Sequence, residues 1–112
     1  MNTLKLITCI VQRGKADKTV ESAIQAGAEG ATIFYARGTG IRQKLGLLGK
    51  LIQSEKEVIM IVTRTGETEK VFKALVESAE IDRPGQGFAF IHTIEKAVGF
   101  LQEEEKAQIT QK

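Results

Sequence analysis

The hydrophobic positions along the chain change their period several times, and each change marks a predicted secondary-structure element. Residues 4–11 form an apolar run that becomes β-branched toward its end, which is typical of a buried strand. Gly14 ends the run, and apolar side chains then recur at the spacing of one helix face over residues 15–26. Gly27 stands where a helix commonly ends with a glycine, and residues 31–37 form a second apolar strand.

The second half of the chain repeats this alternation of strand and helix patterns. Residues 58–63 form a clear third strand, and Thr65 is a candidate N-cap for an amphipathic helix that follows it. Residues 88–94 read as a fourth strand, and a short last strand is expected over residues 97–101.

The order β-α-β, long segment, β-α-β predicts an α+β, ferredoxin-like βαββαβ fold, an antiparallel sheet with two helices on one face. The uncovered face of a sheet rich in Val, Ile and Phe needs a cover, which indicates self-association. Residues 1–102 form the single expected domain, and residues 103–112 form a polar C-terminal tail.

The composition is that of an ordinary folded protein: 112 residues, of which 42% are hydrophobic and 27% charged. No apolar run approaches the roughly 20 residues of a spanning helix, so stable membrane insertion is not expected. The N-terminus lacks an apolar signal region and Cys9 is the single cysteine, so we expect a cytoplasmic protein.

The net charge of +2 conceals an asymmetry between the two halves of the chain. Residues 1–52 carry a net +5 and residues 53–112 a net −3. The basic excess is local, which favours an anion site or a partner patch over a duplex-binding face. With one Tyr, five Phe and no Trp, the chain is poorly supplied for base stacking, and no nucleic-acid partner is expected.

A glycine-bearing basic stretch, residues 36–44, directly follows the second predicted strand. Gly38 and Gly40 allow close backbone approach, and no carboxylate lies between Arg37 and Lys50. Such a stretch is suited to a phosphate or carboxylate ligand. Ordinary turn geometry and loop solubility explain the same residues, and both interpretations remain open here.

A second glycine pair, Gly85 and Gly87, occupies the turn before the fourth strand. Neither pair completes a known phosphate signature. Gln43 stands where the dinucleotide fingerprint requires a third glycine, and Lys44 and Leu51 exclude a P-loop.

The chain shows no paired carboxylates and no nucleophile with an adjacent base, so we expect that it is not an enzyme. His92 is the single histidine and has apolar sequence neighbours, so a structural or solvent-facing role is favoured. No Cys/His cluster suits a metal ion.

These motifs resemble those of the PII nitrogen-regulatory signalling proteins over residues 3–101. The resemblance rests on three segments: Gly30-Ala31-Thr32, Gly38-Thr39-Gly40 with Arg42-Gln43-Lys44, and Gly85-Gln86-Gly87-Phe88-Ala89-Phe90. It implies a homotrimer that binds an adenine nucleotide between protomers, often with 2-oxoglutarate. It also implies a mobile T-loop over residues 38–54 that contacts a target protein.

The resemblance thus implies a signal-transduction protein in nitrogen regulation that needs no cofactor, with ATP, ADP or AMP as possible effector. The target protein stays unidentified. The resemblance and the basic loop nominate these ligand-binding residues: Thr32, Gly38, Thr39, Gly40, Arg42, Gln43, Lys44, Arg83, Gly85, Gln86 and Gly87.

The sequence departs from the family pattern at several positions. Ile41 is inserted before Arg42, and the loop has no tyrosine, so the family's uridylylation is not carried over. The family has three phosphate-binding cations where this chain has Phe88, Gly99 and Leu101.

Two alternatives come from other functional classes. One is a trimeric small-ion or metal-binding protein of the divalent-cation-tolerance type, which would use His92 or Cys9 as a ligand. The other is an acylphosphatase-like enzyme, which would need an Asn to place water, and the chain has only Asn2 at its terminus.

Overall fold

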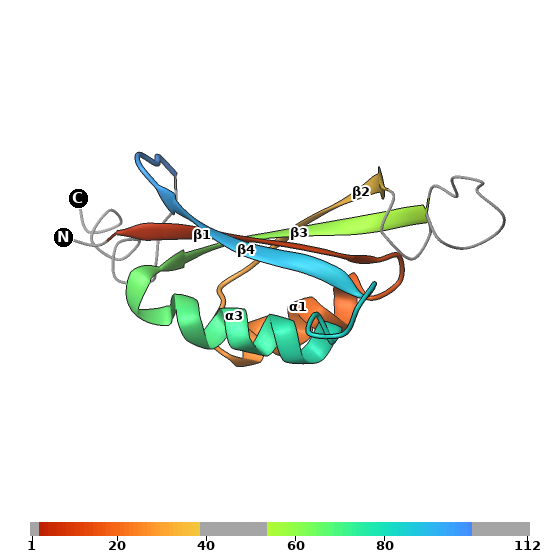
Figure 1. Cartoon of the computed structure of the whole chain (residues 1–112). Helices are drawn as coiled ribbons and strands as arrows, with labels where there is room; N and C mark the ends of the chain where they lie inside the picture. The colour runs from red at the N-terminus through yellow and green to blue at the C-terminus, as the bar shows by residue number, and fades with distance from the viewer. Residues whose placement is uncertain (1–2, 39–53, 100–112) are drawn as a thin grey trace, which may run out of the picture.

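The computed structural model describes residues 3–38 and 54–99, which form one four-stranded sheet with two helices packed on one face (Figure 1). The elements follow in the order β1 (Leu4–Gln12), α1 (Ala16–Gln25), β2 (Thr32–Gly38), β3 (Ser54–Arg64), α3 (Thr65–Ala79) and β4 (Gly87–Ile94). The strands lie in the order β2-β3-β1-β4, and each neighbouring pair is antiparallel. This is the α+β, ferredoxin-like fold that the sequence predicts.

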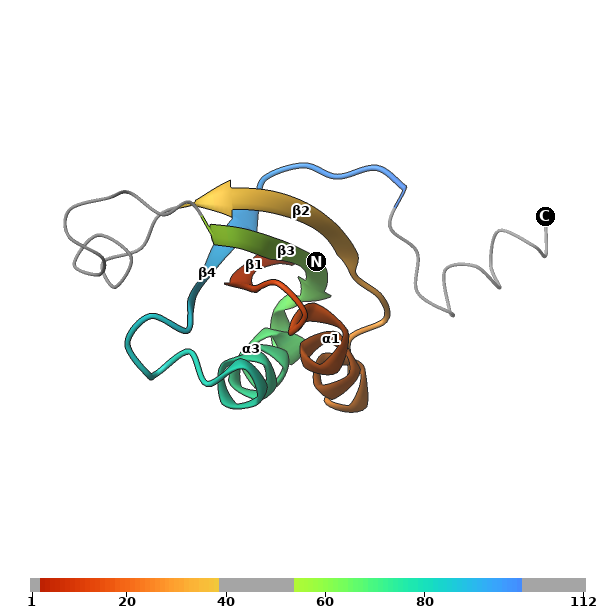
Figure 2. The ribbon, with the colours of Figure 1, turned by 90° about the vertical axis from the view of Figure 1, so that its right-hand side faces the viewer.

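Figure 2 shows the sheet and the two helices as two layers, in a view along the strands. The hydrophobic core lies between these layers. Alternate residues of the two central strands point toward the helices, as the period of two in a strand requires. The apolar side chains that are at most 1% exposed are Ile7, Cys9, Val11, Ala16, Ala23, Ile59, Ile61, Val71, Leu75 and Ala79.

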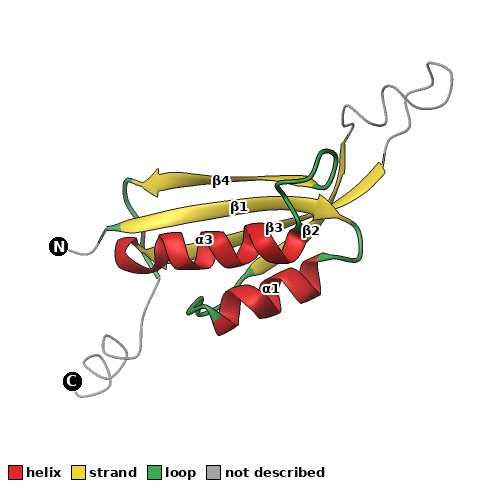
Figure 3. Cartoon of the chain, turned by 60° about the horizontal axis from the view of Figure 1, so that its bottom comes forward, coloured by secondary structure: helices red, strands yellow, loops and turns green. Residues whose placement is uncertain are grey.

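Figure 3 shows α1 and α3 in front of the sheet. The opposite face of the sheet, here called the open face, is covered by no helix of the described residues (Figure 2). It is formed by the other alternate residues of the strands. The strand register places them in rows across the sheet. One row is Phe34, Val58, Ile10 and Phe88, and the next is Thr32, Met60, Thr8 and Phe90. The open face is therefore largely apolar, as the sequence predicts.

Three element boundaries differ from the sequence-based expectation. β3 begins at Ser54 because residues 54–57 pair with the end of β2, although their polar sequence hides the strand. The N-cap of α3 is Arg64, because the N–H and hydroxyl of Thr65 both donate to the carbonyl of Thr3, at 2.9 and 2.8 Å. The expected last strand is wrong over residues 97–99, and its other residues lie outside the described ranges.

Candidate functional site

The two glycine segments lie at the same end of the sheet but on its two edge strands. Gly38 ends β2 opposite Ser54, and Gly87 begins β4 opposite Val11. β3 and β1 lie between them, and three strand spacings of roughly 4.8 Å amount to about 14 Å. One protomer alone does not bring the two segments into contact.

The predicted ligand-binding residues are therefore spread over the sheet. Thr32 begins β2 and Gly38 ends it, which separates them by about 20 Å at roughly 3.3 Å per residue. Five of the predicted ligand-binding residues lie outside the described residues: Thr39, Gly40, Arg42, Gln43 and Lys44.

The glycine at position 87 is explained by packing. A Cβ atom added there would lie 2.3 Å from the carbonyl oxygen of Ile10 and 2.8 Å from Cδ1 of Ile81. Close packing against Ile10 and Ile81 therefore accounts for the glycine at position 87. Gly85 has a φ of 79°, a conformation that favours glycine, and its backbone remains exposed. Arg83 in the same turn pairs with Glu80 at 3.4 Å on the surface.

Residues 12–15, here called the β1–α1 turn, comprise the last residue of β1 and the connection to α1, and they contact this glycine turn. The sequence pattern did not predict this contact. The side-chain amide of Gln12 donates to the carbonyl of Gly85 at 3.1 Å. The Lys15 ammonium donates to Oε1 of Gln86 at 2.5 Å. The β1–α1 turn thus forms one wall of the Gly85–Gly87 segment.

The same turn also contacts the ends of β2 and β3 that flank residues 39–53. The Arg13 guanidinium pairs with Glu55 of β3 and lies 5.2 Å from the ring centroid of Tyr35 in β2. The hydrogen bond and charge of Glu55 raise the pKa of Arg13, so this guanidinium stays charged. Tyr35, Ala36, Arg37 and Glu55 line a hollow of about 240 Å³ beside these contacts.

The side chain of Glu57 in β3 holds the β1–α1 turn in position. Its carboxylate is part of a residue only 7% exposed, and it accepts hydrogen bonds from the N–H groups of Gly14 at 2.7 Å and Ala16 at 3.1 Å. The N-cap residue of α1, Lys15, makes no side-chain capping bond. A carboxylate from β3 therefore caps α1 in its place.

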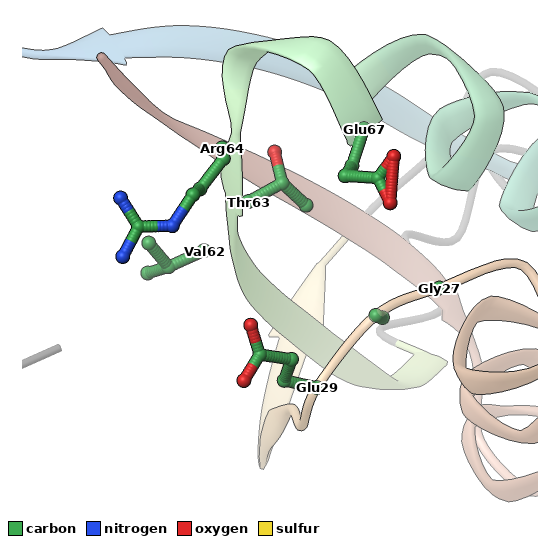
Figure 4. Close-up of a pocket in the computed structure, with 7 residues that line it drawn as sticks. Gly27, Glu29, Val62, Thr63, Arg64 and Glu67 are labelled. Atoms are coloured by element: carbon green, nitrogen blue, oxygen red, sulfur yellow. The ribbon is translucent and has the colours of Figure 1, made fainter. Parts of the chain in front are cut away.

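A second pocket lies at the other end of β3, where the chain enters α3 (Figure 4). Its volume of about 10 Å³ is enough for a single water molecule and too small for an effector. Its lining residues are Gly27, Ala28, Glu29, Val62, Thr63, Arg64 and Glu67.

The two residues that a metal site would use point to opposite faces of the sheet. Cys9 is fully buried beneath the helices, and burial raises the pKa of its thiol to about 11. His92 is exposed on the open face, with its ring centroid 5.0 Å from that of Phe90. Among residues 3–38 and 54–99, no three His, Cys, Asp or Glu side chains are grouped to hold a metal ion.

One sequence signal could have revealed the β1–α1 turn. Arg13-Gly14-Lys15 has the same combination of a glycine and flanking cations as the stretch around Gly38. The partners of these three residues lie 42–71 positions away in the chain, however, so the contacts themselves follow from the strand register.

The structure is that of a small α+β protein with two glycine segments at one end of its sheet. The model of the family "Nitrogen regulatory protein P-II" matches residues 4–104. The chain therefore belongs to the P-II family, whose members are regulatory proteins. No individually curated protein matches the chain. In the described part, no helix has the length and apolar character needed to cross a membrane.

Proposed function

We propose that this protein is a cytoplasmic, homotrimeric regulator of the P-II type, acting in nitrogen regulation. It binds an adenine nucleotide, ATP, ADP or AMP, in clefts between protomers. It transmits occupancy to a target protein through the segment of residues 38–54. The family match over residues 4–104 is the observation that carries this proposal.

The open face supports self-association. Phe34 and Phe88 are 45% and 61% exposed at the two edges of one row, and an apolar sheet face of this kind is normally covered. Since no helix of the described chain covers it, the face is suited to a second copy of the protein.

The separation of the glycine segments supports a site between protomers. Gly38 and Gly87 lie on opposite edge strands of one sheet, so a neighbouring protomer is needed to close a cleft over either segment. Thr32, on the open face at the far end of β2, is then available to a ligand held by another copy.

The small number of cations near the proposed site supports an effector that needs few positive charges on the protein for its binding. Phe88 presents an exposed apolar ring where the family has a lysine, and Gly99 stands in place of an arginine. Arg42 and Lys44 of the basic loop then carry more of the binding, since each charge-assisted hydrogen bond is worth about 1.5–3 kcal/mol.

Two measurements test the proposal separately. Light scattering during size-exclusion chromatography is expected to give about three times the protomer mass of 12.3 kDa. Calorimetric titration with ATP, ADP and AMP is expected to give micromolar binding that Arg42→Ala abolishes. A monomer overturns the trimer, and absence of heat with all three nucleotides overturns the adenine-nucleotide effector.

A further inference from the structure

The side chain of Lys15 places an ammonium group directly on the Gly85–Gly87 turn. Lys15 precedes α1, and its Nζ lies 2.5 Å from Oε1 of Gln86, the central residue of the turn. Gln12 holds the same turn from beside it, through the carbonyl of Gly85. The ammonium therefore lies at the exposed glycine backbone to which a ligand would have access.

The partner of Lys15 differs from those of Arg13 and Arg83, two cations near it. Arg13 pairs with Glu55 and Arg83 pairs with Glu80, so each of these guanidinium groups is neutralised by a carboxylate. Among the described residues, Lys15 contacts the neutral amide of Gln86 and no carboxylate. If an anionic oxygen took the place of this amide, the Lys15 ammonium would donate to a charged acceptor, and a hydrogen bond to a charged acceptor is stronger.

Two backbone donors at the start of α1 are already occupied. The N–H groups of Gly14 and Ala16 already donate to the carboxylate of Glu57. These two N–H groups are therefore not available to a ligand anion, whereas the Lys15 ammonium is.

We propose that Lys15 binds a phosphate group of the effector at the Gly85–Gly87 turn, releasing Gln86 as it does so. The inference rests on the proposed function for the presence of a nucleotide at this end of the sheet. Its content is separate, since it assigns the phosphate contact to a residue of the β1–α1 turn.

Calorimetry with ATP, pyrophosphate and adenosine tests the assignment in the full chain. Lys15→Gln is expected to raise the dissociation constants for ATP and pyrophosphate about 10- to 100-fold, the effect of one lost charge-assisted hydrogen bond. The affinity for adenosine, which has no phosphate, is expected to stay unchanged. Lys15→Arg keeps the charge and is expected to retain most of the affinity for ATP.

Lys18→Gln is the matched control, because it removes the same charge from an exposed position on the same helix. It is expected to bind ATP as the wild type does, and thermal melting of each variant confirms that it is folded. Equal ATP affinity in wild type and Lys15→Gln overturns the Lys15 assignment and leaves the proposed effector standing. Pyrophosphate binding lost in Lys15→Gln, without binding of any adenine nucleotide, overturns the effector and supports Lys15. A wild-type protein that binds neither overturns both.

Discussion

The carboxylate of Glu57 in β3 accepts a 2.7 Å hydrogen bond from the backbone N–H of Gly14, 43 positions earlier in the chain. It also accepts the N–H of Ala16, so one buried side chain satisfies two donors at the start of α1. Because Glu57 belongs to a central strand, this bond sets the position of the β1–α1 turn relative to the sheet. Through that turn it also sets the positions of Arg13 and Lys15.

Replacing Glu57 is expected to destabilise the protein. Glu57→Ala leaves two donors without a protein acceptor and is expected to lower the free energy of unfolding by about 2–3 kcal/mol. Glu57→Gln keeps a neutral acceptor and loses the interaction of its charge with the helix dipole, so its cost is about 1 kcal/mol. Urea unfolding at one fixed protomer concentration measures both variants.

Glu55→Gln is the control for this series, since Glu55 is an exposed acid on the same strand two residues away. Exposed ion pairs contribute little to stability, so its unfolding midpoint is expected to stay close to that of the wild type. Equal midpoints for Glu55→Gln and Glu57→Ala contradict the capping role of Glu57.

Any substitution of Gly87 is expected to destabilise the protein. In Gly87→Ala the new methyl group meets the Ile10 carbonyl oxygen at 2.3 Å, and backbone atoms must move to relieve the contact. We expect a loss of about 3 kcal/mol or more in the free energy of unfolding. Gly66→Ala in the first turn of α3 has nothing within 4 Å of the added Cβ, and a gain of up to about 1 kcal/mol is expected. A Gly87→Ala protein as stable as the wild type would falsify the packing explanation.

Much of the fold follows from local patterns in the sequence. The apolar runs of β1 and β4 and the helical faces of α1 and α3 are set by periodicity, which a single sequence displays. Gly27 has a φ of 118° directly after the C-cap of α1, as its position after the helical pattern predicts. β3 extends farther toward the loop than predicted, because Glu55 and Lys56 pair with β2 although their polar side chains carry no strand signal.

The site is less predictable because its contacts join distant parts of the chain. The β1–α1 turn meets the Gly85–Gly87 turn across 71–73 positions, and only the order of the strands brings them together. Likewise, Gly38 and Gly87 resemble each other in sequence, but the order of the strands places them on opposite edges. Local composition predicted glycine segments with nearby cations, but not which cation lies beside which segment.

The buried thiol of Cys9 is expected to make stability fall at alkaline pH. Burial raises its pKa from 9.0 to about 11, so the unfolded chain releases the proton before the folded protein does. The stabilisation that the protonated Cys9 thiol gives the folded protein is fully present below pH 9 and is lost as the pH rises toward 11. Between pH 8 and 10.5, the free energy of unfolding of the wild type is expected to fall about 2 kcal/mol more than that of Cys9→Ala.

Urea unfolding of both proteins across this pH range makes the comparison, and Cys9→Ala corrects for every pH effect that does not come from the Cys9 thiol. Parallel pH profiles for the two proteins contradict the prediction. In the native state at pH 8, a thiol reagent is expected to label Cys9 far more slowly than in urea, because the thiol is fully buried.

A charge placed at the centre of the open face is expected to prevent the proposed self-association of the protein. Met60 lies in the row between Thr32 and Thr8 on the central strand β3, facing away from the helices. In a monomer, Met60→Glu points into solvent and leaves the fold intact, whereas in a trimer it buries an unpaired carboxylate at a cost of several kcal/mol per protomer. Sedimentation velocity is therefore expected to show monomers for Met60→Glu, with a circular dichroism spectrum like that of the wild type.

Ile24→Glu is the control, because it places the same charged side chain on the outer surface of α1, where Ile24 is 50% exposed. It is expected to keep the wild-type mass. If Met60→Glu keeps the wild-type mass while Ile24→Glu dissociates, the interface lies on the helical side and the assignment of the open face is wrong.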